Sequence, residues 1–229
     1  MLFPGGLTPT TITEFILVVL EGAGAGPYFG EPISQLQHAL QCAALAASAQ
    51  PPVDNSTLIA ALLHDIGQYV PEEEIVSLAG RQPEHILSKD GEDIVGRVGH
   101  EKLGAVLLHR LGFSEKVVRL VESHVAAKRF LCAVDADYYG TLSDASKRSL
   151  EHQGGPFTDS ERDVFASSLW CHEKCQLRKW DDAAKVQGHS VGDVQDWKGM
   201  IYQHLNENLG NPDGCHDENG THGELVQSG

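Results

Sequence analysis

Apolar residues recur at helical spacing along most of this chain of 229 residues. This spacing places them on one face of a helix, whereas a half-buried strand would alternate apolar and polar residues. We find no segment with convincing alternation and no internal repeat. The predicted fold class is therefore all-α, a bundle of helices. The expected helices cover residues 12–22, 34–48, 54–67, 96–113, 114–131, about 159–185 and 191–208.

Two stretches depart from this pattern. Residues 71–92 are polar and charged, with Pro83 and several glycines, and we expect a loop or lid that contains a short helix. Residues 210–229 are polar and glycine-rich without periodicity, which is typical of a disordered tail. The remaining length suits one hydrophobic core. We therefore predict a single domain over residues 1–209, followed by the tail.

Composition excludes several classes of partner. The net charge of −15 and the pI near 5.1 argue against binding to nucleic acid or to an anionic membrane surface. The apolar run FILVVL has no basic segment before it and falls short of the roughly 18 residues of a membrane span. The odd number of five cysteines indicates a reducing compartment, so we expect a cytoplasmic protein. An anionic substrate would need a local positive pocket.

The segment ALLHDIGQ at residues 61–68 ends an apolar helical run with adjacent His64 and Asp65. Neighbours on a helix point about 100° apart, so one metal ion cannot easily use both side chains in the same way. Two metal ions could do so, with Asp65 as a bridge and His64 as a terminal ligand of one ion. The motif therefore predicts further metal ligands elsewhere in the chain.

Burial in an apolar helix separates the candidate ligands from the other histidines, because an unpaired polar group is costly there. Each such histidine alone is more often a satisfied core residue than a ligand. Together with Asp65 and the Asp181–Asp182 pair, they form a credible set for two ions of iron, manganese or zinc. Four of the twelve histidines qualify, namely His38, His64, His100 and His124.

This H…HD…D pattern resembles the HD-domain superfamily of metal-dependent phosphohydrolases and oxygenases. His38, His64–Asp65 and Asp181 match the minimal motif, and His100 and His124 match the additional pair of dinuclear members. The resemblance covers about residues 28–185. It implies an HD-domain helical bundle around a dinuclear metal site.

The stretch YFGEPISQLQHALQ places Tyr28 and Glu31 just before His38. It resembles the mixed-valent diiron oxygenases that cleave organophosphonates, such as the dioxygenase of 2-amino-1-hydroxyethylphosphonate. The resemblance implies that Tyr28 occupies an iron site until substrate displaces it. Glu31 would move with Tyr28 and face the ammonium end of the substrate. The alternative is a capping turn in which Tyr28 packs and Glu31 starts a helix.

Three further residues could bind an anion at the metals. Lys128 follows His124 by four residues and Arg178 precedes Asp181 by three, so each shares a helix face with a ligand. This register favours Asp181 over Asp182 as the ligand, with Asp182 on the surface. The stretch around Ser146 resembles the substrate-binding loop of the family, in which Ser146 would donate a hydrogen bond to the phosphonate. An exposed lysine and a simple cap serine are the alternatives.

The resemblance implies an Fe(II)/Fe(III) pair that uses dioxygen to cleave the C–P bond of 1-hydroxy-2-aminoethylphosphonate, giving phosphate and glycine. An N-methylated substrate, giving a glycine-betaine-type product, is also compatible with Glu31. Many relatives carry a histidine after HDIG where this chain has Gln68, which leaves one substrate contact open. The expected partners are thus a small-molecule phosphonate and O2.

Three other functions remain open. A dinuclear phosphohydrolase acting on a nucleotide or phosphomonoester would use the same six ligands and a metal-bound hydroxide. Tyr28 and Glu31 argue against it, because a hydrolase has no evident need for them. A related oxygenase acting on a polyol, or another substrate without phosphorus, would not require Lys128, Ser146 and Arg178. A non-catalytic regulatory domain would not need a complete ligand set.

Overall fold

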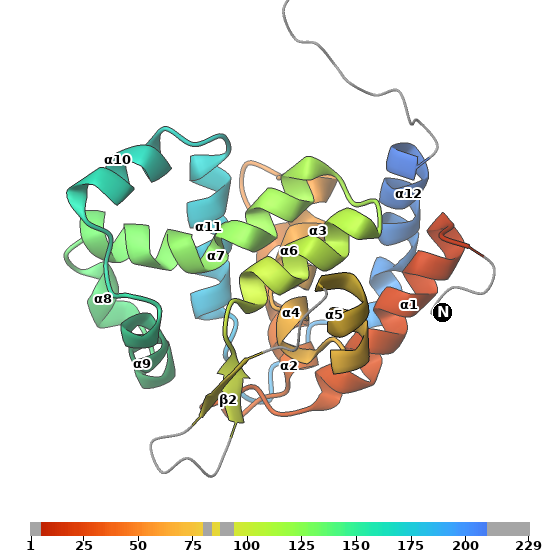
Figure 1. Ribbon diagram of the computed structural model, residues 1–229, viewed down its shortest axis with the longest axis horizontal. Helices are drawn as coiled ribbons and strands as arrows, with labels where there is room; N and C mark the ends of the chain where they lie inside the picture. Colours follow the sequence, from red (N-terminus) through yellow and green to blue (C-terminus); the bar gives the residue numbers. More distant parts are fainter. Residues whose placement is uncertain (1–5, 80–83, 88–93, 210–229) are drawn as a thin grey trace, which may run out of the picture.

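The computed structural model describes residues 6–79, 84–87 and 94–209. The regular secondary structure of the described part of the chain is almost all helix, as the sequence predicted (Figure 1). The longer helices are α1 (Pro9–Glu21), α2 (Gln35–Ala47), α3 (Asn55–Leu63), α6 (His100–Arg110), α7 (Glu115–Val134), α11 (Cys171–Ala183) and α12 (Lys198–Leu209). The shorter ones are α4 (Ile66–Tyr69), α5 (Glu72–Ala79), α8 (Tyr138–Thr141), α9 (Asp144–His152) and α10 (Asp159–Ala166), with 3-10 turns η1 (Ala23–Ala25) and η2 (Val194–Trp197).

Helix α3 lies at the centre of the bundle and packs against α2, α7 and α11. Its apolar residues are buried all around, which is why the segment reads as apolar rather than amphipathic. Helix α6 lies along α7, and the N-terminal helix α1 lies beside the C-terminal α12 (Figure 1). The core is filled by branched aliphatic side chains, among them Ile59, Leu62, Leu108 and Leu120.

Helix starts follow from local capping. Asp54, Ser114 and Ser143 each accept a hydrogen bond from the backbone N–H three residues later, before α3, α7 and α9. These bonds satisfy N–H groups that have no partner within the helix. The first residues of α3 and α7 are therefore fixed by side chains that sequence reading can recognise.

The structure differs from the sequence-based expectation at the long helix expected over about residues 159–185. This segment forms two helices, because α10 ends at Ala166 and α11 begins at Cys171. Trp170 between them has a left-handed backbone with φ of 59°. A non-glycine residue in that conformation cannot continue a right-handed helix. The expected last helix likewise begins as the 3-10 turn η2 before α12.

The expected loop or lid at residues 71–92 contains the short helix α5, as predicted. It also contains a strand that the sequence did not indicate. The strands β1 (His85–Leu87) and β2 (Ile94–Arg97) pair antiparallel, with His85 opposite Arg97 and an irregularity after Ile86. Residues 80–83 and 88–93 lie outside the described residues, as does the predicted tail at 210–229.

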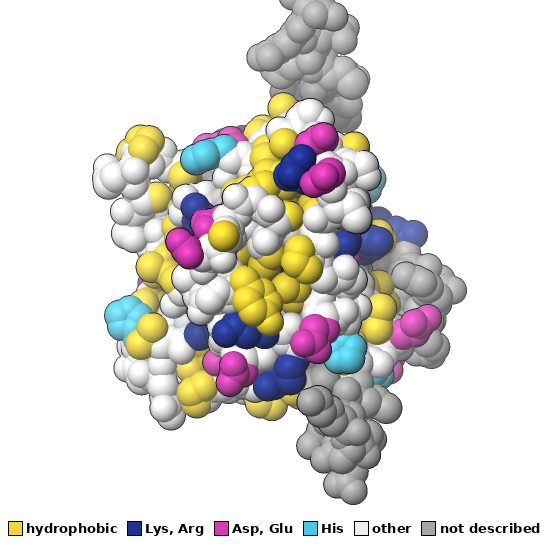
Figure 2. Space-filling model, turned by 90° about the vertical axis from the view of Figure 1, so that its left-hand side faces the viewer, with side chains coloured by type: hydrophobic (Ala, Val, Ile, Leu, Met, Phe, Trp, Pro, Cys, Tyr) yellow, Lys and Arg dark blue, Asp and Glu magenta, His cyan; other side chains and the backbone are white. Residues whose placement is uncertain are grey.

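The surface around α8, α9 and α10 carries mixed charges (Figure 2). Apolar side chains gather near the middle of this face, and basic and acidic side chains lie around them. Among the described residues, no helix combines the length and apolar character that crossing a membrane requires.

Candidate metal centre

The His64–Asp65 pair lies at a break between two helices. Helix α3 ends at Leu63, Asp65 has φ of −98° and ψ of 7°, and α4 starts at Ile66. The break turns both side chains towards the same buried space, which a continuous helix would not do. Gly67 allows it, because a Cβ there would lie 2.7 Å from the backbone nitrogen of Gly104 and closer still to the carbonyl oxygen of His100.

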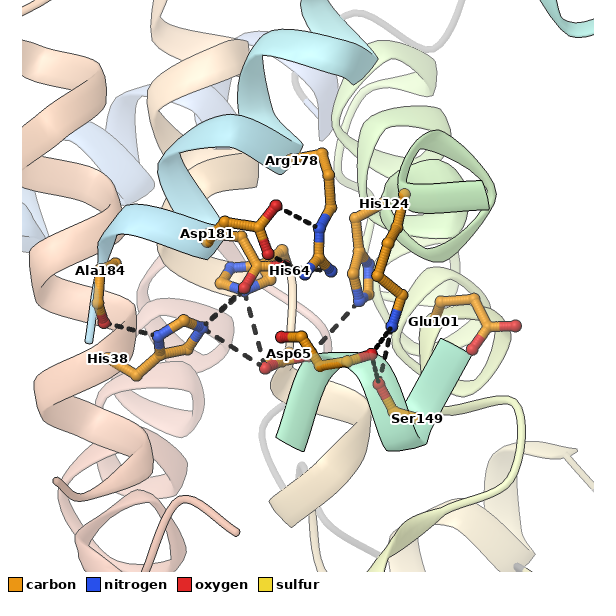
Figure 3. A network of polar contacts seen from close by, with 12 residues as sticks. His38, His64, Asp65, Glu101, His124, Ser149, Arg178, Asp181 and Ala184 are labelled. Carbon is orange, nitrogen blue, oxygen red and sulfur yellow. Dashed lines mark hydrogen bonds and ion pairs between the residues drawn. The ribbon is translucent and has the colours of Figure 1, made fainter. Parts of the chain in front are cut away.

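Four residues from three parts of the chain form a first cluster (Figure 3). The Nε2 atoms of His38 on α2 and His64 lie 3.0 Å apart. Each lies 3.6 Å from Oδ2 of Asp65. Oδ1 of Asp181 on α11 is 3.3 Å from Nε2 of His38 and 3.8 Å from Nε2 of His64.

A second cluster shares Asp65 with the first. The Nε2 atoms of His100, the first residue of α6, and His124 on α7 lie 3.0 Å apart. Oδ1 of Asp65 is 3.2 Å from Nε2 of His100 and 3.4 Å from Nε2 of His124. One oxygen of Asp65 therefore faces each cluster, which is the arrangement expected of a carboxylate between two metal ions. All six side chains are buried.

The hydrogen bonds of the histidines leave their Nε2 atoms as electron-pair donors. Each Nδ1 lies 2.8–3.3 Å from a backbone carbonyl oxygen, which can only accept, so the Nδ1 atoms donate. In neutral imidazoles the Nε2 atoms then carry lone pairs, and two such atoms 3.0 Å apart repel each other unless a cation lies between them. Oδ1 of Asp181 is buried and finds no hydrogen-bond donor among the described residues. The donor set therefore fits two cations.

The ionisation of the cluster agrees with cation binding. Burial opposes the charged form of Asp65, but the surrounding imidazole rings of His64, His100 and His124 hold its pKa well below the usual range. Burial lowers the pKa of His64 to about 4, which keeps this ring neutral and able to bind a metal at neutral pH.

A cavity of about 580 Å³ opens onto both clusters. Tyr28, Glu31 and Gln68 line it together with Asp65, His100, His124 and Asp181, and Lys128, Ser146 and Arg178 also line it. The structure thus places every residue singled out in the sequence at the clusters or in the wall of one cavity.

Lys128 is buried in this wall with neutral partners. Its ammonium donates to Oγ of Ser149 at 2.7 Å and to the carbonyl oxygen of Ser146 at 3.5 Å. Among the described residues, no carboxylate lies within ion-pair distance of it. Burial and the neighbouring Arg178 lower the pKa of Lys128 to about 7. A buried cation without a counter-ion is costly, and an anion bound in the cavity would compensate for it.

Arg178 holds Asp181 in place. Its Nη1 lies 2.7 Å from Oδ2 of Asp181, and its Nε and Nη2 bind Asp182. This contact turns Oδ1 of Asp181 towards the histidines, and Arg178 keeps the pKa of Asp181 well below its usual range despite burial. Asp182 also accepts the hydroxyl of Tyr138. The expectation that Asp182 is a surface residue is therefore wrong, because its carboxylate is largely covered by these partners.

Comparison with known proteins agrees with this geometry. Residues 36–148 match the HD domain family. The chain is 40% identical over 170 residues to hydroxymethylphosphonate dioxygenase of Gimesia maris, covering 74% of this chain and 77% of the relative. The chain belongs to the HD-domain phosphonate dioxygenases. This family assignment confirms the predicted superfamily, the helical fold class and an oxygen-dependent oxidoreductase.

A second member of the HD-domain phosphonate dioxygenases is 32% identical over 199 residues, covering 87% of this chain and 93% of the relative. It is the 1-hydroxy-2-(trimethylamino)ethylphosphonate dioxygenase (glycine-betaine-forming) of Leisingera caerulea. The two relatives therefore differ in the group attached to the hydroxyl-bearing carbon.

Tyr28 and Glu31 lie in one tight turn before α2. The backbone N–H of Glu31 donates to the carbonyl oxygen of Tyr28 at 3.1 Å, and Gly30 adopts φ of 80°. The Tyr28 ring stacks on His38 with centroids 4.1 Å apart and an interplanar angle of 16°. Burial, with Asp181 next, raises the pKa of Tyr28 well above its usual value. The turn thus carries Tyr28 to the first cluster and Glu31 into the wall of the cavity.

Gln68 links α4, beside the two clusters, to the hairpin. Its Oε1 accepts the backbone N–H of Arg97 at 2.9 Å, and its side chain lines the cavity. Gln68 therefore joins α4 to β2.

Sequence reasoning missed Lys185. It follows the end of α11, and its Nζ donates to Oγ of Ser146 at 2.8 Å and lies 3.8 Å from Oε1 of Glu31. No local signal marked it, because it lies beyond the end of α11 and its partners come from segments distant in the sequence.

Proposed function

We propose that this chain is a non-haem diiron oxygenase that cleaves the C–P bond of a 1-hydroxyphosphonate. The reaction is R–CH(OH)–PO3H2 + O2 → R–COOH + H3PO4, in which the carbon is oxidised to a carboxyl group and O2 is the oxidant. The sequence predicted R as an aminomethyl group or its N-methylated form. The relatives act, by their names, on compounds with R as hydrogen or as a trimethylaminomethyl group. The 1-hydroxyphosphonate unit is common to all of them.

The observation that carries this proposal is the position of Lys128. A buried ammonium with only neutral partners lines the same cavity as two histidine–carboxylate clusters that share Asp65. A hydroxyphosphonate satisfies both features, because its oxygens can bind a metal while its negative charge compensates Lys128. A polyol would leave Lys128 without a counter-ion.

Two iron ions suit this donor set of imidazole and carboxylate. We propose His38, His64 and Asp181 as ligands of one ion and His100 and His124 as ligands of the other, with Asp65 between them. The iron pair, in the mixed-valent Fe(II)/Fe(III) state, would supply the activation of dioxygen when bound.

The surrounding residues would bind and orient the phosphonate. Arg178 uses its N–H groups on Asp181, Asp182 and the hydroxyl of Tyr138, and its guanidinium also lines the cavity, where its positive charge would attract a phosphonate. Ser146 accepts a hydrogen bond from Lys185, which leaves its own hydroxyl proton free to donate to the substrate. Tyr28, stacked on His38, would cover the first cluster until substrate displaces it.

The test is the stoichiometry of turnover by the iron-loaded protein. Hydroxymethylphosphonate, 1-hydroxy-2-aminoethylphosphonate and its trimethylammonium analogue are supplied, and phosphate release and O2 uptake are recorded together. We expect one O2 consumed per phosphate with at least one compound, and no phosphate under argon. Phosphate release from a phosphomonoester under argon, with no reaction of the three phosphonates, would instead identify a phosphohydrolase.

A further inference from the structure

The ion pair between Lys185 and Glu31 bears on which 1-hydroxyphosphonate the cavity accepts. Glu31 is the residue that the family resemblance assigns to the ammonium end of an aminated substrate. Here its Oε1 is buried without a hydrogen bond and lies 3.8 Å from Nζ of Lys185. The side chains of Lys185 and Glu31 are 10% and 12% exposed, so solvent screens the pair weakly.

Two more contacts hold Lys185 in this position. Its ammonium donates to Oγ of Ser146 at 2.8 Å, and it lies 5.8 Å from the centroid of the Tyr28 ring. An aromatic face beside a carboxylate is the environment that attracts an alkylammonium group. In this chain a lysine of the protein itself already occupies that environment.

We propose that Lys185 is a specificity-determining residue that excludes substrates with a cationic substituent by neutralising Glu31 and occupying the ammonium position. This inference rests on the proposed C–P cleavage. The substrate class it assigns is a 1-hydroxyphosphonate whose substituent is hydrogen or an uncharged group. A substrate ammonium near Glu31 would face the positive charge of Lys185 at close range, and two like charges in a weakly screened site repel strongly.

The experiment compares two substrates of nearly equal size and different charge. They are 1,2-dihydroxyethylphosphonate and 1-hydroxy-2-aminoethylphosphonate. The second carbon carries a hydroxyl group in the first compound and an ammonium group in the second. The values of kcat/KM are measured from phosphate release, and affinities are measured by anaerobic calorimetry, which does not depend on turnover. We expect the wild-type protein to prefer the dihydroxy compound by about tenfold or more in both measurements.

Replacing Lys185 should change the ratio of kcat/KM values between the two substrates. In Lys185→Met the preference should shift towards the aminated compound by about tenfold or more, because Glu31 is then free to pair with the ammonium. Lys185→Arg keeps the charge and should keep the wild-type ratio. The double variant Glu31→Gln/Lys185→Met should lose the gain for the aminated compound. Lys179→Met, on the exposed side of α11, is the matched control and should leave both substrates unaffected.

The outcomes separate this inference from the proposed function. If the iron-loaded wild-type protein releases phosphate from neither compound nor from hydroxymethylphosphonate, the proposed function fails. If it turns over the aminated compound as well as the dihydroxy compound, the role of Lys185 is refuted while the function stands. The role of Lys185 would also be refuted if folded, iron-containing Lys185→Met kept the wild-type ratio of kcat/KM values for the two compounds. Should that variant not fold, Lys185→Gln is measured in the same way, and an unchanged ratio there has the same meaning.

Discussion

Adding a single methyl group at Gly67 should strongly destabilise the folded protein. A Cβ at residue 67 would lie 2.7 Å from the backbone nitrogen of Gly104 and 2.9 Å from the carbonyl carbon of His100. Favourable contacts begin at about 3.5 Å, and the carbonyl oxygen of His100 would lie closer still, so α4 and α6 would have to separate by more than about 1 Å. The opposing atoms are backbone and cannot rotate away. Overpacking of this kind costs about 3 kcal/mol, the upper part of its usual range.

The same separation should reach the metal centre. Asp65 precedes α4 and His100 begins α6, and their side chains lie only 3.2 Å apart. We therefore expect Gly67→Ala to bind about one iron per chain instead of two, with the loss at His100 and His124. A destabilisation of about 3 kcal/mol should lower the melting temperature by roughly 6–12 °C for a chain of this size.

The assay is thermal unfolding of the metal-free proteins, followed by iron analysis after loading. Metal-free protein is needed because bound iron itself stabilises the folded state. Gly199→Ala is the matched control, since Gly199 is exposed in α12 and nothing lies within 4 Å of a Cβ there. It should stabilise by up to about 0.5 kcal/mol through better helix propensity. Wild-type stability and two irons in Gly67→Ala would refute this reasoning.

Three further variants test individual roles. Asp65→Ala should abolish loading of two irons, and two irons still bound by metal analysis would disprove the bridge. Arg178→Gln should weaken iron binding at the cluster of Asp181 by about 10–100-fold, because Arg178 orients this carboxylate. Chelator competition measures this affinity. Lys128→Met should raise the substrate KM without changing iron content. Because the pKa of Lys128 is about 7, wild-type affinity for a phosphonate should fall by up to about tenfold per pH unit above pH 7, whereas the affinity of Lys128→Met should not show this decline.

The sequence indicated the residues that the structure brings together in the two clusters, because the four histidines lie in apolar helical stretches. A histidine such as His38 or His124 in such a setting needs a partner for its buried nitrogen, so its position carries information. The His64–Asp65 pair added a second constraint, because adjacent side chains on a helix point apart and suit two metal ions rather than one. The break between α3 and α4 was not predicted, since residues 54–67 were expected to form one helix. The helical fold class could be predicted because burial of one face of a helix dictates the spacing of its apolar residues.

Other features depend on contacts between distant segments and left no local signal. Asp182 reads as a surface carboxylate until Arg178 and Tyr138 are placed around it. Lys185 looks like a lysine after a helix end, and its role follows only from the approach of Glu31 and Ser146. The left-handed Trp170 divides a helix that the local pattern reads as continuous.

The most direct test of the account is low-temperature EPR of the iron-loaded protein after mild ascorbate reduction, recorded with and without hydroxymethylphosphonate. We expect a half-integer-spin signal from a coupled Fe(II)/Fe(III) pair whose shape changes when the phosphonate binds. Such a change would place the substrate at two irons that share Asp65. Protein that holds two metal ions per chain yet gives no mixed-valent signal would contradict the account.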